Sequence, residues 1–120
     1  MTTPPKPGSA APAPTSLAAG AAHEVAFGSH KIHYVTLGDG PVTMVFVHGW
    51  ACNLNFWREQ AAAFADQARL VFIDLPGHGQ SDKPNTSYTM DFHARAVAAV
   101  LREARIEKAV FIGHSMGAAV

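Results

Sequence analysis

Apolar residues gather in short segments that alternate with glycine turns and longer amphipathic segments from residue 23 onward. Residues 42–47 form a nearly unbroken apolar run with several β-branched residues, and residues 69–73 and 109–112 are of the same kind. Runs of this length are typical of strands buried on both faces, which belong to parallel sheets. We therefore expect three central parallel strands.

Two longer segments between these strands have apolar positions at helical spacing. The first can be capped by Asn53 or Asn55 and is expected to run to about Gln67. The second can be capped by Thr89 and carries Asp91 in its first turn, where a negative charge stabilises a helix. The apolar stripe of this second helix is predicted to contain Met90, His93, Val97, Val100, Leu101 and Ala104.

A β-hairpin is predicted ahead of the central strands, from residues 24–27 and 31–35 with a turn at Gly28 and Ser29. The order strand, helix, strand, helix, strand that follows describes successive right-handed crossovers. The predicted fold class is therefore α/β, with a mostly parallel sheet and helices on both faces.

Residues 1–22 differ from the rest in composition, with many alanines, one charged residue and no aromatic residue. Such a segment cannot bury enough apolar area to offset its chain entropy, so we interpret it as a flexible tail before a domain at 23–120. Small residues at 19–21 are similar to a signal-peptide cleavage site, which makes export an alternative to the cytoplasm. The apolar region that a signal peptide requires is interrupted by Pro4, Pro5, Pro7, Pro12 and Pro14.

Charge and cysteine content exclude several classes of function. Nine Lys and Arg residues balance nine Asp and Glu residues, which argues against binding nucleic acid or an anionic membrane. Cys52 is the single cysteine, so no internal disulfide forms and a reducing compartment is expected. No run of 18 apolar residues is present to span a bilayer. We expect a small-molecule partner.

The segment Gly113-His114-Ser115-Met116-Gly117 follows a predicted strand and opens an apolar helical segment. In this context a G-x-S-x-G pattern forms a sharp turn whose strained backbone exposes the serine hydroxyl. The two glycines let the strand and the helix approach without a Cβ clash. We therefore interpret Ser115 as a nucleophile and the backbone N–H of Met116 as a donor to an oxyanion.

His48, Gly49 and Trp50 directly follow the strand at residues 42–47, at the carboxyl edge where open α/β sheets bind ligands. Gly49 permits a sharp turn that would aim the Trp50 N–H at the same oxyanion. One such donor typically lowers a barrier by about 3–4 kcal/mol. Core packing of the Trp50 side chain is the alternative interpretation, and it is compatible with a backbone role.

Three segments together resemble the α/β-hydrolase superfamily, namely FVHGW at 46–50, DLPGHGQSDKP at 74–84 and GHSMG at 113–117. Their order and spacing match over about residues 24–120. The similarity is strongest to serine hydrolases that include esterases, lactonases, cofactor-free haloperoxidases and carbon–carbon bond hydrolases. The resemblance implies strands one to five of an eight-stranded sheet, with Ser115 as nucleophile and Trp50 and Met116 as oxyanion donors. A serine at this position argues against the dehalogenase and epoxide-hydrolase branches, which place Asp there.

The family order also implies an acid and then a histidine after the nucleophile. Only three residues follow Gly117, so we expect both groups beyond Val120, in a longer enzyme whose amino-terminal part is this chain. The leading hypothesis is a cofactor-independent serine hydrolase of esters or related acyl substrates. The alternatives are a non-catalytic ligand-binding protein, a lyase or carbon–carbon bond hydrolase that uses Ser115, and an inactive fragment with an exposed apolar sheet edge.

The remaining candidates are interpreted as structural. Asp74 and Asp82 are expected to bind backbone N–H groups of their loop, and Cys52 to be a small buried thiol. Arg105 is expected to be a left-handed helix cap less favourable than Gly. No metal or cofactor site is predicted, because His30 and His33 point to opposite faces of a strand and the loop at 77–82 lacks the pattern of a dinucleotide site.

The histidines interpreted as packing or turn residues rather than catalytic bases are His48, His78 and His114. His23 and His93 are expected at the surface or on a helix face.

Overall fold

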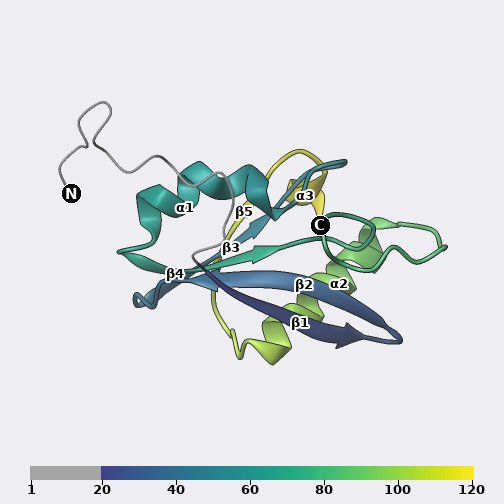
Figure 1. The fold of residues 1–120 in the computed structure, drawn as a ribbon, viewed down its shortest axis with the longest axis horizontal. Helices are drawn as coiled ribbons and strands as arrows, with labels where there is room; N and C mark the ends of the chain where they lie inside the picture. Colours follow the sequence, from purple (N-terminus) through teal and green to yellow (C-terminus); the bar gives the residue numbers. More distant parts are fainter. Residues whose placement is uncertain (1–19) are drawn as a thin grey trace.

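A mixed five-stranded sheet runs through the middle of the protein in the computed structural model, which describes residues 20–120 (Figure 1). The strands are β1 (Ala21–Phe27), β2 (His30–Leu37), β3 (Val42–Val47), β4 (Ala68–Ile73) and β5 (Val110–Gly113). Their order across the sheet is β1-β2-β4-β3-β5. β3 is parallel to both β4 and β5, whereas β2 is antiparallel to β1 and to β4.

The predicted hairpin and the three predicted parallel strands are all present, so the α/β class is confirmed. β1 begins at Ala21, two residues before the predicted start of the domain at His23. Residues 1–19, which make up most of the predicted tail, lie outside the described residues.

Helices cover both faces of the sheet (Figure 1). One face carries η1 (Leu54–Trp57) and α1 (Arg58–Phe64), the other face carries α2 (Met90–Glu103), and α3 (Met116–Ala119) follows β5. The α2 cap is the predicted one, because the Thr89 side chain accepts a hydrogen bond from the Phe92 N–H at 3.0 Å.

The first helical segment differs from its prediction in form and length. Asn53 is the cap, and its side chain accepts from the Asn55 N–H, but the first turn is a 3₁₀ turn. α1 ends at Phe64 rather than near Gln67. The Gln67 N–H donates to the Phe64 carbonyl at 2.9 Å, which closes a tight turn and directs the chain into β4.

Two apolar clusters, one on each face, explain why the central strands are apolar throughout. On the α1 face Phe46 stacks on Phe72 with ring centres 4.8 Å apart and also contacts Trp57. On the α2 face Val45 and Val71 pack under the helix and are fully buried. Successive side chains of β3 and β4 therefore enter opposite cores, and neither strand has a solvent face.

The chain reverses its direction across the sheet at β3. It leaves β3 for β4 on one side and returns through α2 to β5 on the other side. Ligands of open α/β sheets bind where strand order reverses in this way, outside the carboxyl ends of the strands. That edge carries the loops that begin at His48, Asp74 and His114, so the topology points to the same place as the sequence motifs.

We predict that Arg105→Gly stabilises the protein expressed from its complete gene. Arg105 has φ 58°, in the left-handed region, and follows the last turn of α2. Glycine adopts this conformation without the Cβ penalty, so the free energy of unfolding should rise by about 0.5–1 kcal/mol in thermal or denaturant unfolding. The control Arg102→Gly, inside α2, should lower it by about 1 kcal/mol. A lower stability of Arg105→Gly would contradict this interpretation.

Candidate active site

The turn between β5 and α3 holds Ser115 in a strained backbone conformation. Its φ of 57° and ψ of −119° lie outside the regions that L residues favour, at a cost of about 1–3 kcal/mol. The residue is exposed to solvent among the described residues. The G-x-S-x-G segment therefore forms the strand, sharp turn and helix that its context predicts.

Two glycines let this turn pack directly against the neighbouring backbone. A Cβ atom on Gly113 would lie 2.5 Å from the Ala118 Cα, and one on Gly117 would lie 2.2 Å from the Val47 carbonyl oxygen. Both positions are too close for any side chain. The start of α3 is thus in direct backbone contact with the end of β3.

The turn after β3 lies against Ser115. A Cβ atom on Gly49 would lie 3.3 Å from the Ser115 Cβ and 2.9 Å from the His114 carbonyl oxygen. The turn is closed by the Cys52 N–H, which donates to the Gly49 carbonyl at 3.2 Å. The structure therefore brings the two predicted motifs together at the carboxyl edge of β3 and β5.

The predicted oxyanion donors are both available for a ligand. Among residues 20–120, neither the Trp50 N–H nor the Met116 N–H has a hydrogen-bond partner. The Trp50 side chain is 63% exposed and meets the His78 ring edge-on, so core packing is wrong for this side chain. Because the side chain is exposed, the contribution predicted for Trp50 comes from its backbone N–H.

Two imidazoles connect the turn after β3 with the loop after β4. His48 Nε2 accepts from the Leu75 N–H at 3.0 Å, and His78 Nε2 accepts from the Ala51 N–H at 3.1 Å. Each ring also has a carbonyl partner at Nδ1, Gly49 for His48 and Pro76 for His78. The structural interpretation of both histidines is confirmed.

Burial keeps His48 neutral. Desolvation lowers the pKa of His48, and the neighbouring His78 acts in the same direction, while the Gly49 carbonyl and Asp74 oppose them. A neutral ring that donates at Nδ1 has Nε2 free to accept, as the contact with Leu75 requires.

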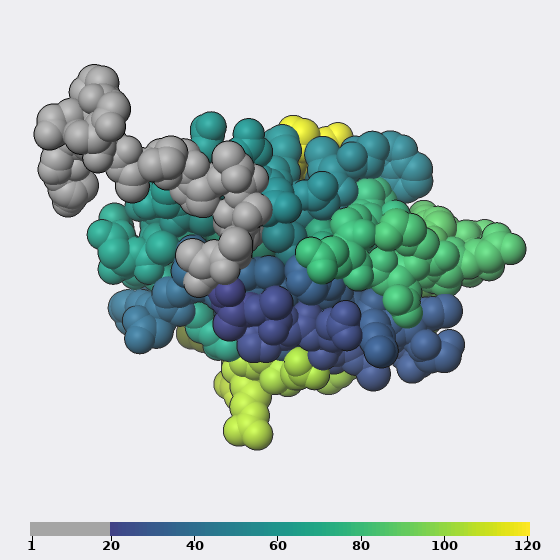
Figure 2. Space-filling view, viewed as in Figure 1, coloured from purple at the N-terminus to yellow at the C-terminus, as the bar shows by residue number. Residues whose placement is uncertain are grey.

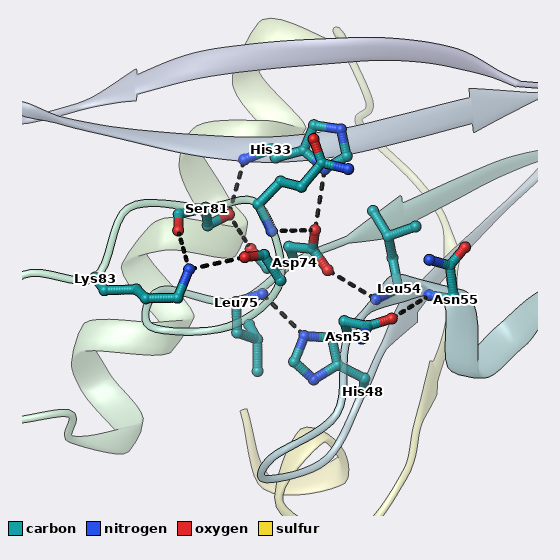
Figure 3. Close-up of polar contacts among 11 residues, drawn as sticks. His33, His48, Asn53, Leu54, Asn55, Asp74, Leu75, Ser81 and Lys83 are labelled. Carbon is teal, nitrogen blue, oxygen red and sulfur yellow. Dashed lines mark hydrogen bonds and ion pairs between the residues drawn. The ribbon is translucent and has the colours of Figure 1, made fainter. Parts of the chain in front are cut away.

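Asp74 makes the third connection between these loops (Figure 3). Its carboxylate accepts from the Leu54 N–H at 2.7 Å and from the Gln80 N–H at 3.0 Å, and it contacts His33 Nδ1 at 3.0 Å. All of these groups are buried or partly buried. The prediction that Asp74 binds backbone N–H groups is confirmed. Figure 2 shows the two connected segments, near residues 50 and 80, side by side on the surface.

His93 lies on the apolar stripe of α2, as predicted, and is completely buried. Of its two predicted places, the surface or a helix face, the helix face is the one found. Within the described part of the chain neither ring nitrogen has a hydrogen-bond partner. Burial lowers its pKa, and the nearby His78 and His48 add to this effect. The apolar stripe of α2 points into the core at this position, and His93 shares it with Val97 and Val100.

The Asp82 carboxylate accepts a backbone N–H as predicted, but from Lys31 in β2, at 2.9 Å, rather than from its own loop. Cys52 is half-buried, so the prediction of a buried thiol is met only in part. The His23 ring contacts the Thr36 hydroxyl. No group of three or more His, Cys, Asp or Glu residues suited to a metal ion occurs within residues 20–120. No helix in that range is long and apolar enough to cross a membrane.

A cavity of about 210 Å³ lies beside the turn after β3. It is lined by Trp50, Ala51, Gly77, His78 and Tyr88. Nothing in the sequence pattern indicates that Tyr88 lines this cavity or that His78 contacts Ala51, because these residues come from segments far apart in the chain.

Comparison with known proteins supports the same fold. Residues 42–120 match the family described as the alpha/beta hydrolase fold. The chain is 38% identical over 90 residues to the dihydrolipoyllysine-residue acetyltransferase component of the acetoin cleaving system of Cupriavidus necator. This match covers 75% of this chain and 24% of that protein. The chain is 33% identical over 98 residues to a soluble epoxide hydrolase of Corynebacterium sp., with 82% of this chain and 34% of that protein covered.

A solved structure of Est816, an N-acyl homoserine lactone degrading enzyme, superposes with a TM-score of 0.76 at 40% sequence identity. The match covers 79% of this chain and 36% of Est816. The chain therefore spans between about a quarter and about a third of the length of these relatives.

We predict that His93→Phe stabilises the protein and flattens its acid sensitivity. The pKa of His93 is lower in the folded state than in the unfolded chain. As the pH falls below about 6.5, this histidine is therefore protonated in the unfolded chain before it is protonated in the folded protein. Wild-type stability should therefore drop between pH 7.5 and pH 5, and the drop should be smaller in the variant. At pH 7.5 the loss of two unpaired nitrogens should raise the free energy of unfolding by about 1 kcal/mol.

His93→Gln is the matched control, because it removes the titration but keeps a buried polar group. It should flatten the pH dependence without the gain at pH 7.5. Parallel pH profiles for the wild type and both variants, measured by denaturant unfolding, would refute the assignment to His93.

Proposed function

The chain belongs to the alpha/beta hydrolase fold family, and from this premise we propose that it is a serine hydrolase of carboxylic esters and related acyl compounds. One observation carries the proposal. Ser115, with a positive φ, lies at the carboxyl edge of the sheet beside the turn at Gly49. Among the described residues, the N–H groups of Met116, next to Ser115, and of Trp50, next to Gly49, have no hydrogen-bond partner.

Acyl transfer follows from this arrangement. The Ser115 hydroxyl oxygen attacks the substrate carbonyl carbon and loses its proton to a general base. The Trp50 and Met116 N–H groups stabilise the negative oxygen of the tetrahedral intermediate. The base then gives this proton to the leaving oxygen, so the intermediate collapses to an acyl-enzyme and a neutral alcohol. Water attacks the acyl-enzyme and loses a proton to the base, which passes it to the Ser115 oxygen as the carboxylic acid leaves.

The general base is proposed to come from sequence beyond residue 120. Among the described residues, no histidine forms a hydrogen bond to the Ser115 hydroxyl. The His114 ring instead packs against Phe56, with ring centres 4.6 Å apart. Removal of a triad base from enzymes of this kind lowers the rate by several orders of magnitude, so this group matters for the whole protein.

Ester and lactone substrates fit the nucleophile best. Est816 is described as degrading N-acyl homoserine lactones, and a lactone is a cyclic ester that a serine opens by acyl transfer. The soluble epoxide hydrolase among the relatives is named for a different reaction. The resemblance in the sequence implies that the epoxide-hydrolase branch has Asp at the position of Ser115. We therefore propose acyl substrates rather than epoxides.

The test is covalent labelling of Ser115 in the protein expressed from its complete gene. We expect a serine-directed fluorophosphonate probe to label the wild type and the protein to hydrolyse p-nitrophenyl acetate. Ser115→Ala should abolish labelling and reduce turnover by about 10⁴-fold or more. Ser87→Ala, which changes an exposed serine in the loop after β4, should behave as the wild type.

Equal labelling of the wild type and Ser115→Ala would eliminate the nucleophile. Binding of esters without any turnover would favour a ligand-binding protein on the same fold.

A further inference from the structure

The turn that carries the Trp50 N–H is itself strained. Ala51 has φ 63° at the third position of the turn from Gly49 to Cys52, where a positive φ normally requires glycine. An alanine in this region carries a steric penalty that glycine avoids. The turn keeps this conformation only if other contacts stabilise it.

Two hydrogen bonds do so. The Cys52 N–H closes the turn onto the Gly49 carbonyl, and the Ala51 N–H donates to His78 Nε2 at 3.1 Å. The second bond fixes the orientation of the Trp50–Ala51 peptide, because rotation of that peptide would turn the Ala51 N–H away from the imidazole. It is the contact that opposes relaxation of the strained residue.

We propose that His78 is a positioning residue for the oxyanion hole: its imidazole holds the strained Ala51 and thereby fixes the turn that carries the Trp50 N–H beside Ser115. The inference rests on the proposed function, because it concerns the same backbone donor. His78 touches neither Ser115 nor the proposed oxyanion, so it acts through the turn.

This role requires an acceptor at Nε2. His78 Nδ1 donates to the Pro76 carbonyl, so Nε2 is left to accept from the Ala51 N–H. A side chain without an acceptor at this place would release the Ala51 N–H.

The groups that face His78 come from three parts of the structure. From the loop after β3, the His48 ring is centred 5.0 Å away and the Trp50 ring 5.2 Å away. From α2, the buried His93 ring is centred 6.1 Å away, and from the loop after β4, Tyr88 lines the cavity with His78. The nearby carboxylate, Asp74, is already bound to backbone N–H groups and His33. The His78 ring is therefore flanked by side chains from all three parts.

Two variants with amide side chains test the contact to Ala51 independently of the other contacts of His78. His78→Gln places an acceptor close to the former Nε2 and does not titrate. His78→Asn retains a donor close to the former Nδ1 but does not reach the Ala51 N–H.

With p-nitrophenyl acetate and the protein expressed from its complete gene, we expect His78→Asn to lower kcat by about 10- to 100-fold with little change in KM, as for a misplaced oxyanion donor. His78→Gln should recover most of this loss. Equal kcat values for His78→Gln and His78→Asn, or an unchanged kcat in His78→Asn, would overturn the proposal.

Hydrogen exchange gives a second measurement. After correction for intrinsic exchange, the Ala51 amide should be protected in the wild type and should lose its protection in His78→Asn, whereas the Leu75 amide, which is bound to His48, should keep its protection in both. An unprotected Ala51 amide in the wild type would count against the proposal, even if His78→Asn fails to fold.

The labelling of Ser115 separates this inference from the proposed function. If the fluorophosphonate probe does not label the wild type, the proposed function fails. If it labels the wild type and His78→Asn at the same rate, the serine chemistry stands and the role of His78 fails.

Discussion

Backbone contact between the end of β3 and the turn after β5 fixes the geometry of the candidate site. Gly117 lies so close to the Val47 carbonyl, and Gly49 so close to His114, that neither position has room for a side chain. The two N–H groups proposed to bind an oxyanion therefore come from segments held together without flexible atoms between them. Donors placed in this way need no reorganisation during a reaction.

The strain in this region is offset by buried polar contacts rather than by the apolar cores. Ser115 and Ala51 both have positive φ without being glycine, and both belong to the loops at the carboxyl edge. Next to them, Asp74, His48 and His78 accept backbone N–H groups across the two loops. Strain of about 1–3 kcal/mol per residue persists only where surrounding contacts determine the conformation.

Local signals predicted much of the fold and part of the site. The apolar runs located the strands, Thr89 marked the start of α2, and the motif around Ser115 identified the sharp turn. The contact between His78 and Ala51 joins residues 27 positions apart and depends on which loops meet in space, which no local pattern contains. The apolar stripe of α2 that contains His93 was predicted, but whether the imidazole lies at the surface was left open, and the packing of α2 on the sheet decided its burial.

Trp50 offers a direct optical view of this site. Its indole is largely exposed and lies edge-on against the His78 ring, whereas Trp57, the other tryptophan, is buried on the far side of the sheet from α2. Indole emission responds to solvent and to the groups that contact the ring. The fluorescence of one natural side chain thus reports on the turn in solution, without an attached dye.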